Sequence, residues 1–435
     1  MIEIQHPETL ALHAGFHHDP ATGAVAVPIY QTTSFQFDSA EHAANLFALK
    51  ELGNIYTRIM NPTADVLEKR VAALEGGVAA LAVASGQAAS ALAVQNLARI
   101  GDNIVSSTNL YGGTYNLFAN TFKDMGIEVR FVDPSDPEGF ARATDDRTRA
   151  YYAETLPNPK LEVFPIAEIA AIGRRFGIPL IMDNTACPLL VRPFDHGAAI
   201  VVYSATKYLG GHGTTIGGVI VDGGNFDWSD AARQPALHLP DPSYHGAVWV
   251  EAAKPLGPIA YILRARVCLL RDLGPAMSPH SAFMILQGIE TLPLRMERHC
   301  QNAQKVVDFL AAHPDVTRVI HPSQQTGEAG ARAAKYMRGS ERGGLLGMEL
   351  RGGEAAGRDF INRLKMVLHV ANIGDAKTLA IHPASTTHSQ LEAEEQMSAG
   401  VSPGYVRLSV GIEHIDDILA DLRQALESSR LRAAA

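Results

Sequence analysis

The sequence predicts an α/β protein with a large, mostly parallel sheet and a smaller C-terminal α+β domain. One observation is that short apolar runs alternate with helix-like segments from about residue 64 to 275. Another is that the apolar run 179–182 ends in Asp183, and the run 200–203 ends in Ser204-Ala-Thr-Lys207. Short apolar runs bounded by turn signals are typical of buried parallel strands. Both polar clusters therefore lie at carboxyl ends of strands, where open α/β sheets bind ligands.

Length and composition exclude several classes of protein. A chain of 435 residues is long enough for two or three domains and a large core. The net charge of −9 provides no basic field for nucleic acid or an anionic membrane. The first ten residues lack the pattern of a signal peptide, and no run of about 18 apolar residues could span a bilayer. Three cysteines without CxxC spacing indicate a reducing compartment, so we expect a cytoplasmic protein.

Residues 1–63 are predicted to form an N-terminal arm, because their apolar segments are short and broken by proline. At the end of the arm, Thr63 is expected to cap a helix in which Leu67, Val71 and Leu74 fall at helical spacing. Gly76-Gly77 ends this helix.

Residues 64–275 form the predicted sheet domain. The expected strands are 79–84, 103–106, 128–132, 150–153, 179–182, 200–203 and 218–221. The expected helices are 87–100, 114–125 and 166–176. Residues 225–258 carry prolines and aromatic residues without clear periodicity, which indicates a long loop or insertion.

Residues 276–435 form the predicted second domain. Residues 297–312 and 414–426 are expected to be helical, and 344–350 and 406–412 to be strands. Because side chains alternate along a strand, Arg407 is expected on the opposite face from Val406 and Leu408.

The strand-end residues suit pyridoxal 5′-phosphate, for which a lysine forms the Schiff base, an acid pairs with the pyridinium nitrogen and hydroxyls reach the phosphate. Taken alone, Asp183 could equally be a metal ligand or a cap, and Lys207 a solvated side chain. Ser85-Gly-Gln87 opens a helix and could bind a phosphate or be a plain turn. Tyr111 could stack on a flat ring or be a half-buried core residue.

Other ligand motifs are absent from the sequence. The glycines of GGHG at 210–213 occur in the wrong order and place for a nicotinamide-nucleotide fingerprint, and no GxxxxGK[ST] motif is present. The prolines after Glu154 indicate a turn. The histidines lack metal-binding spacing, so no metal site is predicted.

Six motifs together resemble the Cys/Met-metabolism family of pyridoxal-phosphate enzymes. They are YTRIMNPT, SGQAA, YGGTY, DNT, SATKYLGGH and VRLSVGIEHIDD, and they occur in the family's order across nearly the whole chain. The resemblance implies the aspartate-aminotransferase-like fold, called fold type I of pyridoxal-phosphate enzymes.

The resemblance also implies a role for each matching position. Lys207 corresponds to the Schiff-base lysine, Asp183 to the pyridinium partner and Tyr111 to the ring-stacking residue, and these three are the expected catalytic residues. Arg407 corresponds to the clamp for the substrate α-carboxylate. The positions that match contacts to the cofactor phosphate or O3′ are Gly86, Gln87, Ser204, Thr206 and Asn158.

Tyr56 and Arg58 correspond to a pair that reaches the phosphate of a neighbouring subunit. This implies at least a dimer and usually a tetramer built as a dimer of dimers. Tyr56 and Tyr111 are also expected to contact the substrate. Two departures from the family pattern are Ala186-Cys187 after DNT and Gln87, where many members have methionine.

Within the family, residues 372–388 and the insertion at 226–257 are most similar to enzymes that act on O-acetylhomoserine and sulfide. Gly113 also differs from the cysteine typical of methionine γ-lyases. The expected reaction is γ-replacement, which gives homocysteine and acetate for methionine biosynthesis. The alternatives are an O-succinylhomoserine sulfhydrylase, a cystathionine γ-synthase, a methionine or cystathionine γ-lyase, or a regulatory protein that keeps the fold without chemistry.

Overall fold

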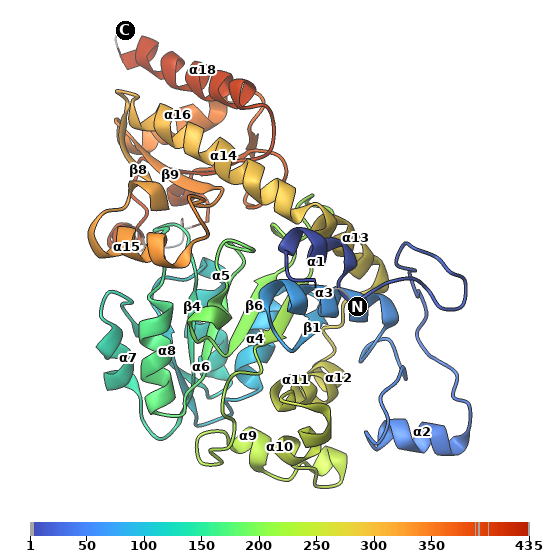
Figure 1. Ribbon diagram of the computed structural model, residues 1–435. Helices are drawn as coiled ribbons and strands as arrows, with labels where there is room; N and C mark the ends of the chain where they lie inside the picture. The colour runs from blue at the N-terminus through green and yellow to red at the C-terminus, as the bar shows by residue number, and fades with distance from the viewer. Residues whose placement is uncertain (1–3, 388, 390–391, 399, 434–435) are drawn as a thin grey trace.

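The computed structural model describes residues 4–433 except 388, 390–391 and 399. Its larger part (Figure 1) is built around a sheet of seven strands. The strand order is β1-β7-β6-β5-β4-β2-β3. The strands are β1 Ala79–Val83, β2 Asn103–Ser107, β3 Glu128–Val132, β4 Thr148–Glu154, β5 Leu180–Asp183, β6 Ile200–Ser204 and β7 Gly218–Asp222. All seven predicted strands exist, with ends shifted by at most two residues. β7 runs antiparallel to both its neighbours, and the other ladders are parallel.

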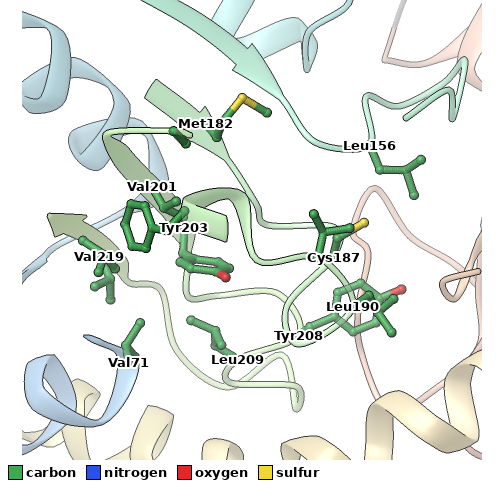
Figure 2. Packing of buried hydrophobic residues seen from close by; sticks show 14 of the residues in the cluster. Val71, Leu156, Met182, Cys187, Leu190, Val201, Tyr203, Tyr208, Leu209 and Val219 are labelled. Carbon is green, nitrogen blue, oxygen red and sulfur yellow. The ribbon is translucent and has the colours of Figure 1, made fainter. Parts of the chain in front are cut away.

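Alternate residues of the central strands face two separate hydrophobic layers, which explains their continuous apolar sequences. Met182, Val201 and Val219 face the layer that also contains α3 (Pro62–Glu75) and α8 (Ile166–Arg175), as Figure 2 shows in part. Their neighbours in the strands face the other layer, which contains α4 (Gly86–Gln95), α11 (Ala260–Arg264) and η5 (Ala265–Leu270). The central strands are therefore buried on both faces.

A second sheet of five strands lies in the C-terminal part, with the order β10-β11-β12-β9-β8. Its strands are β8 Val316–Ile320, β9 Leu345–Leu350, β10 Leu368–His369, β11 Leu379–Ile381 and β12 Tyr405–Ser409. Three helices share a hydrophobic core with it: α14 Leu292–Ala311, α16 Gly353–Arg363 and α18 Ile415–Ala433. The sequence predicted only β9 and β12, because β8 is largely exposed and β10 and β11 are very short.

Most of the other helices outside the segment 225–258 are short. They are α1 Pro7–His13, α2 Ala40–Phe47, α5 Gly112–Asn116, η1 Leu117–Thr121, α6 Phe122–Asp124, α7 Pro137–Ala143, η2 Pro193–His196, α12 Arg271–Leu273, α13 Pro279–Glu290, η6 Pro322–Gln324, α15 Gly327–Tyr336, η7 Pro383–Ser385 and α17 Ala393–Ser398. The arm that carries α2 extends away from the large sheet (Figure 1). No helix within the described part of the chain is both long and apolar enough to cross a membrane.

Several local expectations were wrong. The cap of α3 is Asn61, whose side chain accepts a hydrogen bond from the Thr63 N–H, whereas the Thr63 hydroxyl donates to Pro28 O at 2.8 Å and so fastens the arm. The predicted helix 87–100 ends at residue 95, and the side chain of the next residue, Asn96, donates to the Tyr261 carbonyl. The predicted helix 114–125 begins at Gly112 and contains a π-helical turn.

The segment 225–258 is not a long structureless loop. It contains four short helices, α9 Pro235–His238, η3 Pro242–Tyr244, α10 Trp249–Ala252 and η4 Lys254–Leu256. Asp241 organises the segment by accepting hydrogen bonds from the Ser243 N–H and from Trp249 Nε1 at 3.1 Å.

The domain limits 1–63, 64–275 and 276–435 stay predictions. The two sheets agree with one α/β unit and one smaller unit, but α13, which the sequence did not predict, packs Ala282 and Ile285 into the core of the large sheet. We therefore propose that the first unit extends beyond residue 275.

Candidate active site

A cavity of about 330 Å³ opens at the carboxyl edge of the large sheet and extends to the C-terminal sheet. It brings together residues that are far apart in the sequence, because the carboxyl ends of parallel strands meet at one edge. The predicted site residues that line it are Gly86, Gln87, Tyr111, Asn158, Asp183, Ser204, Thr206, Lys207 and Arg407. Tyr56 and Arg58 are not among its lining residues.

One end of the cavity suits a phosphate group. Helix α4 begins there, with the Ser85 side chain accepting a hydrogen bond from the Ala88 N–H at 3.1 Å. A Cβ atom on Gly86 would lie only 2.6 Å from Ser204 Cβ, so only glycine lets the helix approach the end of β6 this closely. The hydroxyls of Ser204 and Thr206 lie at the same end, and a helix N-terminus with hydroxyl groups beside it favours an anion.

Asp183 and Glu154 lie side by side on the floor of the cavity. They are register partners on the parallel strands β5 and β4. Burial raises the pKa of the Asp183 carboxyl, and burial together with the Asp183 charge raises that of Glu154 well above its usual range. Burial disfavours the charged form of Asp183, and a cation beside it, such as a protonated ring nitrogen, would offset this loss of solvation.

Glu154 is a site residue that the sequence interpretation missed, because only a turn was expected there. Its carboxylate accepts a hydrogen bond from the Tyr111 N–H and so fixes the loop that carries the tyrosine. The Tyr111 side chain is 55% exposed, which leaves its ring open to a bound molecule or to a second chain. Gly113 permits this ring position, since a Cβ there would lie 2.5 Å from Tyr111 Cε1. The position of Glu154 at a strand end, next to the strand of Asp183, is the signal that could have revealed it.

Lys207 projects from the turn after β6 into the same cavity. Its Nζ donates a hydrogen bond to Asn372 Oδ1, from the loop between β10 and β11. Burial, together with the nearby Arg407 cation, lowers the pKa of Lys207 to about 8. An amine with this pKa is neutral in a much larger fraction of molecules near neutral pH than an ordinary lysine, and only the neutral form is a nucleophile or base.

Arg407 lies on β12 and faces the cavity, while Val406 and Leu408 face the C-terminal core, as the alternation predicted. It is only 7% exposed, and its Nη2 donates to Asn372 O at 3.1 Å. Among the described residues no carboxylate forms an ion pair with it. A buried guanidinium without an anion is costly, so the site is suited to a ligand carboxylate.

Tyr56 and Arg58 lie on the arm, outside the cavity. The Arg58 guanidinium lies 5.4 Å from the centre of the Tyr56 ring, and its Nη1 donates to the carbonyl of Arg271. Their contact with a neighbouring subunit's phosphate stays a prediction.

The residues fit pyridoxal 5′-phosphate on structural grounds. The buried Asn158 Oδ1 has no hydrogen-bond partner among the described residues, the acid on the floor lacks a cation, and the helix end approaches a hydroxyl cluster. Fold and site together define a pyridoxal-phosphate-dependent enzyme. No group of three or more potential metal-ligating side chains occurs in the part of the chain that the structure describes.

Comparison with known proteins gives the family. The family model for Cys/Met metabolism PLP-dependent enzymes matches residues 8–427, and the chain belongs to this family. O-acetyl-L-homoserine sulfhydrylase from Leptospira meyeri is 57% identical over 97% of both chains. O-acetyl-L-homoserine sulfhydrylase 1 from Thermus thermophilus is 53% identical over 96% of this chain and 99% of its own.

Comparison with solved structures agrees with this family assignment. A putative O-acetylhomoserine (thiol)-lyase from Campylobacter jejuni, which carries a pyridoxyl-lysine phosphate, superimposes with a TM-score of 0.92 at 42% identity. That match covers 97% of this chain and 99% of the other. The structure of metB from Corynebacterium glutamicum gives a TM-score of 0.82 at 32% identity and covers 98% of each chain.

Proposed function

We propose that this chain catalyses γ-replacement on O-acetyl-L-homoserine, with sulfide as the nucleophile and L-homocysteine and acetate as products. The observation that carries the proposal is one cavity that places a low-pKa lysine, a buried acid and an unpaired buried arginine together. Full-length similarity to sulfhydrylases at 57% and 53% identity supports the same substrate.

Different residues of the cavity would have different roles in this reaction. When bound, pyridoxal phosphate supplies an electron sink for the charge that develops at the substrate Cα. Asp183 would stabilise a protonated ring nitrogen, because an adjacent cation would offset the burial that raises the pKa of this carboxyl. Arg407 would hold the α-carboxylate, and Lys207, which lines the same cavity, would accept the Cα proton. Tyr111 would cover the ring of the bound cofactor, and its exposed side chain could assist proton transfer.

The charges of the cavity favour the acetyl ester. Lys207 and Arg407 are the cationic residues among the described lining residues, and both already have roles, whereas Glu154 and Asp183 are acidic. A succinyl group would bring a second carboxylate without a cation of its own. The acetyl group carries no charge, so its ester avoids that cost.

We therefore expect kcat/KM with sulfide to be at least about 10-fold higher for O-acetylhomoserine than for O-succinylhomoserine, which corresponds to about 1.4 kcal/mol. Steady-state assays of both esters with the same preparation measure this ratio. Cysteine offered in place of sulfide serves as the control for the nucleophile. A preference for the succinyl ester, or for cysteine, would replace the proposal by a succinyl-dependent enzyme or a cystathionine γ-synthase.

We further propose that the active enzyme is a dimer of dimers with shared sites. Support comes from the location of Tyr56 and Arg58 outside their own cavity and from Tyr111 and Ile216 at its mouth, which are 55% and 64% exposed. The three buried free cysteines agree with a reducing compartment, and we place the enzyme in the cytoplasm.

Mixed oligomers test the shared site. Arg58→Ala and Lys207→Ala chains are each expected to be inactive, but subunits exchanged between them should regain activity, because one of the two sites in a hybrid dimer has both residues intact. Activity should approach about a quarter of the wild-type value, since half of the dimers in a random equal mixture are hybrids and each hybrid has one intact site. Affinity tags on the two chains verify that hybrids form. Inactive hybrids would mean that Arg58 acts within its own chain.

A further inference from the structure

We propose that Asn372 is a positioning residue for Lys207, which holds the free side-chain amine beside Arg407 through a neutral acceptor. The inference rests on the proposed function, because it assumes that the Lys207 amine takes the substrate proton. The observation behind this inference is that Asn372 contacts both Lys207 and Arg407. Its side-chain Oδ1 accepts from Lys207 Nζ, and its main-chain oxygen accepts from Arg407 Nη2 at 3.1 Å.

The loop that carries Asn372 is fixed against the turn that carries Lys207. The Ala376 N–H donates to Gly211 O at 2.8 Å, and the Gly374 N–H donates to Ser409 Oγ at 2.9 Å. Gly374 has φ of +69°, and a Cβ on it would lie 2.7 Å from Tyr208 N. The loop therefore touches the chain immediately after Lys207 and also the end of β12. These contacts set the position of the Asn372 amide relative to the lysine.

An amide at this position differs from a carboxylate in its effect on the lysine. The other titratable groups that line the cavity are Arg407 from β12, Asp183 from β5, Glu154 from β4 and Tyr111 before α5. Burial lowers the pKa of Lys207, and the Arg407 cation lowers it further. A neutral amide oxygen orients the amine and leaves this low pKa in place. A carboxylate at 372 would favour the protonated lysine and would also compete with the substrate carboxylate for Arg407.

The pair Asn372→Asp and Asn372→Leu separates these effects, because aspartate matches asparagine in size and adds a charge, whereas leucine has the same branching and no acceptor. The pKa of Lys207 is measured in the full-length chain without cofactor by competitive labelling with trace acetic anhydride, followed by peptide mass spectrometry. Lys254, whose side chain is 68% exposed, is the internal reference in every sample. In the wild type, Lys207 should titrate near pH 8.

We expect Asn372→Asp to raise the pKa of Lys207 by at least about 1 unit, as a close opposite charge does. Asn372→Leu should lower it, because the protonated amine loses its acceptor. Lys254 should not change. Both variants should reduce kcat, and the acidic limb of the kcat profile should move up in pH for aspartate and down for leucine. A residue with only a structural role would not move these values in opposite directions.

The same labelling experiment separates the inference from the proposed function. Added pyridoxal phosphate should protect Lys207 from acetylation in the wild type. If it does not protect, the assignment of Lys207 fails. If it protects but Lys207 keeps one pKa in the wild type and in both variants, the role of Asn372 is wrong. Should the leucine variant fail to fold, the aspartate variant alone decides, since unchanged titration there already contradicts the proposal.

Discussion

Lys207→Ala is expected to lower kcat for O-acetylhomoserine and sulfide by at least about 10³-fold, in the upper part of the usual range for loss of a general base. The residue is the only lysine among the described residues that line the cavity, and its amine is held in a low-pKa state by burial and by Arg407. The other titratable groups on the floor of the cavity are the carboxyl groups of Glu154 and Asp183. Although burial raises their pKa values, they are not positioned to replace Lys207 as the base for the Cα proton. Steady-state assays at saturating substrate measure the loss.

The matched control is Lys254→Ala, which removes an exposed lysine from the insertion and should change kcat by less than about twofold. Wild-type enzyme should be yellow from cofactor joined to lysine, and borohydride reduction should fix the cofactor on the peptide that contains Lys207. Lys207→Ala should lose this covalent attachment and still bind cofactor at the phosphate end of the cavity, where Ser204 and Thr206 remain. Attachment to another lysine would refute the assignment.

Arg407→Ala is expected to lower kcat/KM for O-acetylhomoserine by at least about 10²-fold. Loss of one partner of a buried charge pair typically costs roughly 2–5 kcal/mol, and about 1.4 kcal/mol corresponds to a factor of ten. The guanidinium is 7% exposed and donates from Nη2 to the Asn372 carbonyl. Among the described residues no carboxylate pairs with it, so a substrate carboxylate can bind it in a planar, bidentate arrangement.

Arg407→Lys is the conservative control and should recover only part of the loss, because an ammonium group cannot reproduce the planar pair of donors. The visible spectrum of the bound cofactor should stay as in the wild type, since Arg407 lies at the substrate end. The alanine variant should also raise the pKa of Lys207, because it removes the cation that lowers it. A kcat/KM within about threefold of the wild type would place the carboxylate elsewhere, because that ratio is only about 0.7 kcal/mol.

The sequence by itself determined the strands of the large sheet and most of the candidate site. Most of the seven strands are short apolar runs between turn residues, and burial on both faces is what makes such a run continuous. The edge strand β3, which contains Glu128 and Arg130 and is only partly buried, is an exception. The polar residues that follow these runs must lie at the carboxyl edge. The order of strands and polar residues along the chain therefore predicts that Asp183, Ser204 and Lys207 lie close together, and all three line the cavity.

Only the tertiary structure decided which residues of distant segments touch. The antiparallel direction of β7, the pairing of Glu154 with Asp183 and the contact of Asn372 with Lys207 all depend on strand order and domain packing. The sequence showed Glu154 only as the start of a turn and Asn372 only as part of a subfamily pattern. Local spacing determines which face of a strand or helix a side chain occupies, but contacts across separate sheets are selected by the packing of the whole chain, which no short stretch of sequence contains.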